Sequence, residues 1–315
     1  MKRFVCLLLA LILMCCSFAG CSKKAFADEK INIVATVFPP FDFARAIAGE
    51  KANVTQLVRA GSESHSFEPT PDDVKKAQDC DLFLMLGGES ESWAERINSS
   101  LGGKSRKTVV LNQYVTLLEE HSGEIHDEKA HADHEHSHKH AHDEHFWTSP
   151  LNAIKMSEAI YNALCEIDGT NKEYYEKNFL RLKAELEGLH NDFLSLFNAS
   201  AKPTLVFGDR FPFLYLTTEY RLSYVAAFPG CAEQTEPDIK TLISLIKRIK
   251  AENIPVVFYT EFSSRQTANM LCEETGAVAL LLHSCHNVTK TEMEGGATYV
   301  SLMYNNLKNL KFALK

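Results

Sequence analysis

The feature that most constrains the fold is a long amphipathic segment in the middle of the chain, from about Lys172 to Phe197. Its apolar residues recur at alternating spacings of four and three, which places them on one face of a helix of about seven turns. These residues are Tyr175, Phe179, Leu182, Leu186, Leu189, Phe193 and Leu196. Such a helix can join two domains as a rigid rod. A helical bundle would need a partner helix of similar length, which the sequence lacks.

Short apolar runs alternate with helical segments on both sides of this helix. Before it, the patterns predict strands at 31–37, 54–58, 81–86 and 108–111, and helices at 41–48, 71–78, 93–101 and 151–165. After it, they predict strands at 204–207, 256–259 and 278–282, and helices at 239–251, 264–275 and 299–314. Alternation of this kind is typical of βαβ units around a parallel sheet. We therefore expect two α/β domains, at 31–170 and 201–315, joined by a linker helix at 171–200.

The first residues have the pattern of an export signal. Lys2 and Arg3 precede an apolar run at 4–16, which is short for a membrane span. Phe18-Ala19-Gly20-Cys21 then resembles the lipobox of bacterial lipoproteins, in which the cysteine is lipidated and becomes the new N-terminus. We expect a signal peptide at 1–20, a lipid on Cys21 and a tether at 21–30. The alternative is an ordinary secretory signal that is cleaved nearby, for example after Ala27.

Histidine is concentrated in one segment. Nine of the 13 histidines lie at 121–145, together with seven acidic residues and two lysines. With one isoleucine as its only large apolar residue, this segment cannot build a core and is predicted to be a loop. We expect this loop to bind metal weakly instead of serving as an inert spacer. Its role is predicted to be auxiliary, so that a tighter metal site elsewhere survives deletion of residues 121–142. The auxiliary histidines are His121, His126, His131, His134, His136, His138, His140 and His142.

The net charge and the cysteines exclude several classes of function. A net charge of -8 argues against a broad nucleic-acid surface. Five cysteines follow Cys21, and no CxxC pair occurs, which argues against a zinc knuckle or a thioredoxin-like site. In an exported protein one disulfide is plausible, and Cys231 with Cys285 is the favoured pair. The alternative is that all five are buried thiols.

Four further histidines are candidates for a primary metal site. His65 lies in a turn-rich segment after a predicted strand, and His145 lies beside Phe146 and Trp147 where the histidine-rich loop ends. His283 and His286 follow the last apolar strand. Imidazole is a good ligand for zinc, and the ends of parallel strands are where α/β sheets bind ligands. We expect these segments to meet in a cleft between the two domains.

Together these segments carry a resemblance that covers nearly all of the chain after the signal. The sequence resembles the zinc-binding lipoproteins of bacterial metal ABC importers, the metal-specific cluster A-I group with a rigid helical linker. The matching segments are 61–71, which contains His65-Ser66-Phe67-Glu68-Pro69, the histidine-rich loop, His145-Phe146-Trp147-Thr148-Ser149-Pro150, 87–93, 273–277 and 298–306.

The resemblance implies a site of about four ligands drawn from both domains. His65 and His145 match two histidine ligands of the family. A third family histidine is expected near Gly208, where this sequence has none, so we expect His283, His286 or both to replace it. Weaker candidates are Glu63, Asp209 and Glu261, although Asp209 could simply pair with Arg210, and water could complete an open site.

The implied function is the capture of Zn(II) outside the cytoplasm and its delivery to the permease and ATPase of an ABC importer. We expect a monomer that is anchored by lipid to the outer face of the cytoplasmic membrane or lies in the periplasm, with no nucleic-acid partner. A ligand set of neutral imidazoles favours Zn(II), and a carboxylate-rich set would instead favour a manganese or iron homologue.

Two other functions are alternatives to metal capture for an importer. A zinc hydrolase is disfavoured because the sequence has neither an HExxH motif nor a GxSxG elbow. An adhesin role is compatible with the sequence as a second activity.

Overall fold

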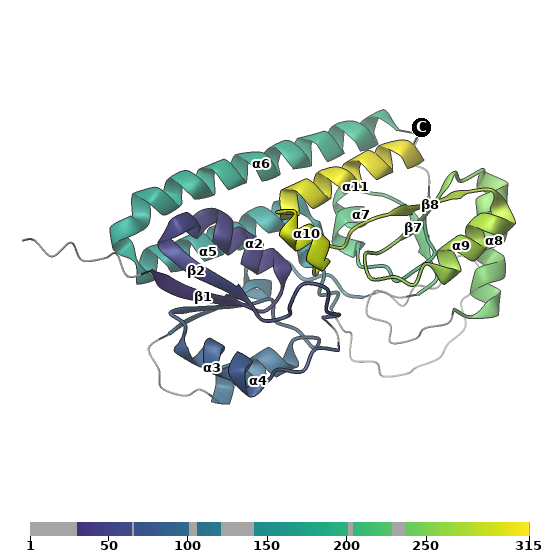
Figure 1. Ribbon diagram of the computed structural model, residues 1–315. Helices are drawn as coiled ribbons and strands as arrows, with labels where there is room; N and C mark the ends of the chain where they lie inside the picture. The colour runs from purple at the N-terminus through teal and green to yellow at the C-terminus, as the bar shows by residue number, and fades with distance from the viewer. Residues whose placement is uncertain are drawn as a thin grey trace, which may run out of the picture. The chain divides into compact units, whose positions relative to one another are not determined.

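Two separate parallel sheets organise the chain (Figure 1). The computed structural model describes residues 30–64, 66–100, 106–120, 142–200, 204–228 and 237–314. The first sheet has the strand order β2-β1-β3-β4 and the second has β6-β5-β7-β8. Every neighbouring pair in both sheets is parallel. Two α/β lobes with a long helix between them are therefore confirmed.

The strands and helices alternate as the sequence predicts. The strands are β1 (Ile31–Ala35), β2 (Ala52–Gln56), β3 (Leu82–Met85), β4 (Lys107–Val110), β5 (Leu205–Phe207), β6 (Tyr224–Ala226), β7 (Val256–Tyr259) and β8 (Val278–Leu281). The α-helices are α2 (Phe38–Ala48), α3 (Pro71–Asp79), α4 (Ser92–Ser100), α5 (Pro150–Ile167), α6 (Lys172–Ala199), α7 (Leu214–Tyr220), α8 (Ile239–Glu252), α9 (Gln266–Thr275), α10 (Lys290–Glu294) and α11 (Tyr299–Ala313).

The differences from the sequence prediction are at short elements and helix ends. Strand β6 and helices α7 and α10 were not predicted, because three to seven residues are too few to show a clear hydrophobic period. Helix α2 begins at Phe38, three residues earlier than expected. Pro39 and Pro40 fit its first turn, where a backbone N–H has no helical partner to lose.

Helix α6 confirms the predicted long helix, with 28 residues. Its buried face contains Tyr175, Asn178, Phe179, Leu182, Leu186, Leu189, Phe193 and Phe197. Leu196 is only half-buried, since a helix of 3.6 residues per turn rotates slowly away from a strict repeat of seven. The helix packs against α5 and α2 of the first lobe and against α11, which runs beside it in Figure 1.

The two lobes share one apolar core. The largest cluster of buried apolar side chains includes Leu84 of β3, Phe258 of β7 and Leu186 of α6. A second, smaller cluster lies between the second sheet and helices α8 and α9, and contains Val257 and Leu245. Because close-packed interiors resist deformation, a shared core favours small movements between the lobes over wide opening.

Each sheet also has a point where the chain order reverses, between β1 and β3 in the first and between β5 and β7 in the second. Loops that leave two such strands diverge, and they open a crevice at the carboxyl ends of the strands. In the second lobe these loops begin at Gly208 and at Thr260. Residues from both loops line the cavity described below.

A buried amide joins the loop after β8 to the loop after β2. Asn287 is 1% exposed, and its Nδ2 donates to the carbonyls of Arg59 (2.9 Å) and Ser62 (2.8 Å). Its Oδ1 accepts from Gln56 Nε2 (2.8 Å) and from the backbone N–H of Val288 (2.9 Å). All four hydrogen-bonding positions of the amide are thus used, and the two loops are fixed against each other.

A second joint holds the start of α11 on the first lobe. The carboxylate of buried Asp42 accepts from the backbone N–H of Tyr299 (2.6 Å) and from Arg45 Nε (2.6 Å). Arg45 also donates to the carbonyl of Ala297. Tyr299, itself fully buried, donates its hydroxyl to the carbonyl of Trp147 (2.6 Å). Helix α11 is therefore bonded both to α2 and to the turn that follows His145.

Within the described part of the chain, no helix combines the length and the apolar character that crossing a membrane requires.

The role of Asn287 in joining the two loops can be tested by measuring the free energy of unfolding. We expect Asn287→Ala to lower the free energy of unfolding by about 2–4 kcal/mol, because it removes all four hydrogen bonds of a buried amide. Urea denaturation followed by circular dichroism measures the change. Asn191→Ala, at an exposed position of α6, is the matched control and should stay within about 0.5 kcal/mol of the parent. A loss as small as that of the control would contradict the role given to Asn287.

Candidate metal centre

A small cavity of about 50 Å³ lies where loops of both lobes meet, and we call it the His cavity. Its first-lobe lining comes from the loop after β2 and from the segment before the turn η3 (Phe146–Thr148). Its second-lobe lining comes from the loops after β5, β7 and β8. The lining residues are Glu63, Ser64, His145, Arg210, Pro212, Thr260, Glu261, Phe262, Ser284 and His286.

His145 is held firmly at the entrance to η3. It is 2% exposed, and its backbone N–H donates to Asp143 Oδ1 (2.8 Å) while its carbonyl accepts from Thr148 Oγ1 (2.8 Å). The neighbouring Trp147 donates its indole N–H to the carbonyl of Ser284 (2.8 Å), which ties this turn to the loop after β8. These contacts fix the backbone of the turn that carries His145.

A carboxylate lies beside the His145 ring, with Asp143 Oδ1 3.3 Å from Nδ1. Burial alone lowers the pKa of His145, but the charge and hydrogen bond of Asp143, with smaller contributions from the charges of Glu144 and Glu120, raise the pKa above its usual value. Asp143 itself is 2% exposed, and its carbonyl accepts from the hydroxyl of Tyr215 (2.7 Å).

His286 approaches from the second lobe. Its Nδ1 is 3.0 Å from the hydroxyl of Ser64, the residue that precedes His65, and its ring packs on Trp147 with centroids 4.8 Å apart. The rings of His145 and His286 meet edge to face, with centroids 5.8 Å apart. Two imidazoles on one tetrahedral zinc, with Zn–N bonds of about 2.0 Å, have centroids about 5 Å apart. A small side-chain adjustment would let both rings bind one ion.

His283 lies in different surroundings, although it is only three residues away. Its Nδ1 accepts from the backbone N–H of Cys285 (2.9 Å), and its Nε2 is 3.5 Å from Glu292 Oε1. Its own backbone exchanges two hydrogen bonds with Asn306, both 2.7 Å long. The imidazole of His283, together with the donors of Thr289, lowers the pKa of Glu292 to about 2. Among the described residues, His283 is not one of those that line the His cavity.

The three weaker candidates are placed differently from one another. Glu261 lines the cavity, but its carboxylate accepts from the N–H (2.8 Å) and the hydroxyl (2.5 Å) of Ser284. Glu63 also lines the cavity. Asp209 is outside the lining, and its Oδ2 accepts from the N–H (2.8 Å) and the hydroxyl (2.7 Å) of Thr260.

The loop after β5 has no room for a histidine at Gly208. A Cβ atom there would lie 2.5 Å from the Cα of Ala268 in α9, closer than real side chains come to a backbone. Two residues of this loop line the cavity, Arg210 and Pro212, and Arg210 is the charged one. The suggested pairing of Arg210 with Asp209 is wrong, since the carboxylate of Asp209 is bonded to Thr260.

Cys285 lies between the two histidines of the last loop. It is a free thiol, fully buried, with its Sγ 3.7 Å from the carbonyl of His283. Its predicted disulfide partner, Cys231, lies outside the described residues. Cys80, Cys165 and Cys272 are also free thiols.

Several predicted residues lie outside the described ranges. They are Cys21, His65, Cys231 and the histidines His121, His126, His131, His134, His136, His138 and His140. Within the described ranges, no group of three or more histidine, cysteine or acidic residues is arranged to hold a metal ion. The His cavity itself supplies two histidines, and His65 is the residue that follows Ser64 in the chain.

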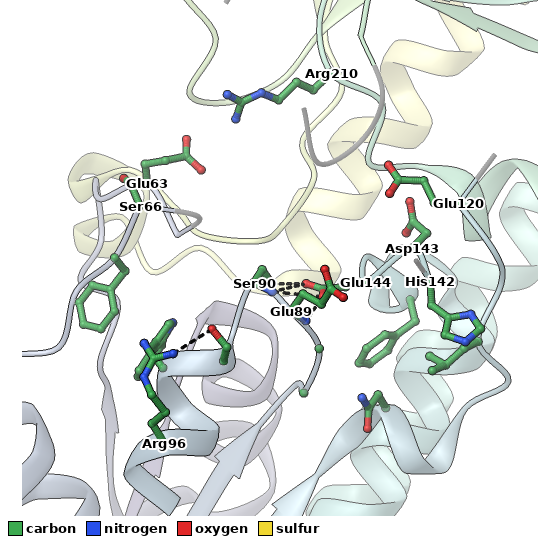
Figure 2. A pocket seen from close by; sticks show the side chains of 18 of the residues that line it. Glu63, Ser66, Glu89, Ser90, Arg96, Glu120, His142, Asp143, Glu144 and Arg210 are labelled. Carbon is green, nitrogen blue, oxygen red and sulfur yellow. Dashed lines mark hydrogen bonds between the residues drawn. The ribbon is translucent and has the colours of Figure 1, made fainter. Parts of the chain in front are cut away.

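A larger pocket of about 860 Å³, drawn in Figure 2, shares part of its wall with the His cavity. We call it the acidic pocket, because the described residues that line it include six carboxylates and two arginines. The carboxylates are Glu63, Glu68, Glu89, Glu120, Asp143 and Glu144, and the arginines are Arg96 and Arg210. His142, where the described chain resumes after the histidine-rich segment, is exposed and lines the pocket too. A pocket of this charge attracts cations.

Sequence reasoning missed four residues that shape the site, namely Ser64, Asp143, Arg210 and Asn287. Asp143 was hidden among the acidic residues of the histidine-rich segment. Ser64 lies within the matching segment 61–71, Arg210 was considered only as a partner of Asp209, and Asn287 directly follows His286. Their residue types alone did not mark them as parts of the site. These residues could have been predicted from their positions, because they lie directly beside candidate ligands or just after the ends of strands.

Known proteins show similarity over almost the whole chain. The zinc-binding lipoprotein AdcA of Streptococcus pneumoniae is 32% identical over 99% of this chain, which spans 61% of that protein's length. The high-affinity zinc uptake system protein ZnuA of Bacillus subtilis is 32% identical over 97% of this chain and 95% of its own. The crystal structure of the Zn(II)-bound ZnuA-like domain of S. pneumoniae AdcA matches with a TM-score of 0.74 and 30% identity, and covers 90% of this chain and 99% of that one.

A family model covers the same region. It is described as ZnuA, zinc-uptake complex component A periplasmic, and it matches residues 33–313, a range that contains both lobes and the whole His cavity. This chain belongs to the ZnuA family of zinc-uptake components.

Proposed function

We propose that this protein is the extracytoplasmic binding component of a bacterial ABC importer and that it captures Zn(II) in the His cavity. The observation that carries the proposal is the convergence of His145 and His286, from different lobes, on one small buried cavity. The relatives named for zinc binding and zinc uptake support the choice of ion. The protein is a carrier in this proposal and has no catalytic role.

The proposed first ligands are His65, His145 and His286. Three neutral imidazoles leave one position of a tetrahedral zinc open. His283 is assigned a supporting role, because both of its ring nitrogens face groups of the protein. Glu261 is likewise assigned a supporting role, since its oxygens are used by Ser284. A ligand set dominated by imidazole favours zinc over manganese or iron.

Delivery is proposed to depend on small changes in a stiff molecule. The shared core and the Asn287 joint hold the two loops that carry the ligands, so release needs local movement of side chains and loops. The acidic pocket beside the cavity would concentrate cations near His145, as the auxiliary histidines would. A lipid on Cys21 would keep the protein beside the permease and ATPase that receive the ion.

The ligand assignment predicts a clear order of effects among histidine variants. We expect His65→Ala, His145→Ala and His286→Ala each to raise the Kd for Zn(II) by more than about a hundredfold, because each removes a bond to the metal. His283→Gln should raise it by less than about tenfold, as expected for a supporting residue. Competition with a fluorescent zinc chelator measures the Kd, and circular dichroism confirms that each variant folds.

His142→Ala is the matched control, since His142 is exposed and lines only the larger pocket. Its Kd for Zn(II) should equal that of the parent. If His283→Gln abolishes tight binding while His286→Ala does not, the assignments of these two residues are reversed.

The Asp143 carboxylate predicts the pH dependence of zinc binding. Because it raises the pKa of His145, protons compete with zinc as the pH falls through that raised pKa, and affinity declines. Asp143→Asn removes the charge, lowers the pKa and should shift the decline to lower pH. At the alkaline plateau the variant should bind about tenfold more weakly, since the ring loses its orienting partner.

The measurement is the Kd for Zn(II) across about pH 5 to 8, the range in which histidine changes charge. Glu68→Gln removes a carboxylate of the acidic pocket that is not part of the His145 contact, and it should leave the midpoint of the decline unchanged. A midpoint that moves to higher pH in Asp143→Asn would contradict the proposed role.

A further inference from the structure

The neck between the two cavities carries one acidic and one basic side chain. Glu63 and Arg210 are the two residues that line both the His cavity and the acidic pocket. They come from different lobes, Glu63 from the loop after β2 and Arg210 from the loop after β5. In Figure 2 both side chains project into the open space of the pocket. The two cavities therefore adjoin at these two side chains.

Arg210 carries a permanent charge that makes no direct contact with a carboxylate of the described residues. Among the described residues it makes no hydrogen bond and no ion pair, and it is half-buried. Asp209, the adjacent carboxylate, is bonded to Thr260, and Glu261 of the same cavity is bonded to Ser284. The guanidinium cannot lose its proton at any physiological pH. An arginine with five donors in a planar fork therefore faces the cavity with its donors unused.

Such a charge is unfavourable beside a dication unless an anion lies between them. Zinc on three neutral imidazoles keeps its full charge of two, and the cation of Arg210 would repel it. A carboxylate-type anion removes this conflict, since one oxygen can bind the metal while the other accepts from the guanidinium. The small His cavity opens beside a pocket of about 860 Å³, which leaves room for such an anion at the neck.

We propose that Arg210 forms an anion subsite, so that the protein takes up zinc together with a small carboxylate-type oxyanion. The anion replaces water at the open position of the metal and accepts paired N–H donors from Arg210. This inference rests on the proposed function, because it requires zinc in the His cavity. Glu63, at the same neck, is the carboxylate of the chain itself that could compete for this role.

The test measures the Kd for Zn(II) with and without acetate, at constant ionic strength set by sodium perchlorate, a weakly coordinating salt. A competing chelator fixes the free zinc concentration. In the parent protein, acetate should lower the Kd about tenfold, the effect expected of one charge-assisted contact. Arg210→Gln should lose this response, and Arg210→Lys should keep only part of it, because lysine cannot form the paired contact.

Arg96→Gln is the matched control. Arg96 lines the acidic pocket but not the His cavity, so this variant removes the same charge from the pocket and should keep the full acetate response. A second readout is the visible spectrum of the Co(II)-loaded protein, which should shift with acetate in the parent and not in Arg210→Gln.

The outcomes separate the two proposals. Weak zinc binding by the parent under all conditions would overturn the proposed function. Tight binding that ignores acetate, or a response that persists in Arg210→Gln, would overturn the anion subsite alone. If acetate has no effect and Glu63→Gln weakens binding, Glu63 supplies the anion from within the chain and the inference is wrong.

Discussion

The site depends on one buried amide. Asn287 uses both donors and its acceptor oxygen to hold the loop after β8 against the loop after β2. Those two loops carry His286 and Ser64, which are themselves in contact. A buried amide with every position satisfied stabilises one arrangement strongly, since any other arrangement strands its polar groups away from water. The two sides of the His cavity are thereby held at a set separation.

The surrounding structure extends this constraint to His145. The hydroxyl of Tyr299 and the indole of Trp147 bind the turn after His145 to α11 and to the loop after β8. The core shared by the two lobes lies beneath these contacts.

The local pattern of apolar and polar residues was sufficient to predict most of the strands and helices. The repeat of apolar residues in α6 and the alternation of short strands with helices both follow from the period of burial, which is local. Elements of three to seven residues, such as β6 and α10, were not predicted because they are too short to show a hydrophobic period. The loop-like sequence around Cys285 likewise gave no indication that this position is fully buried.

The sequence by itself determined the fold class, the long helix, the family resemblance and the set of histidines from which a zinc site could be built. Only the tertiary structure decided which of the neighbouring pair His283 and His286 faces the cavity, and that Arg210, not a residue at Gly208, projects into it. The reason is physical. Residue type records which chemistry is available, whereas the direction of a loop side chain is set by contacts with residues far away in the chain, such as Asn306 for His283 and Ser64 for His286.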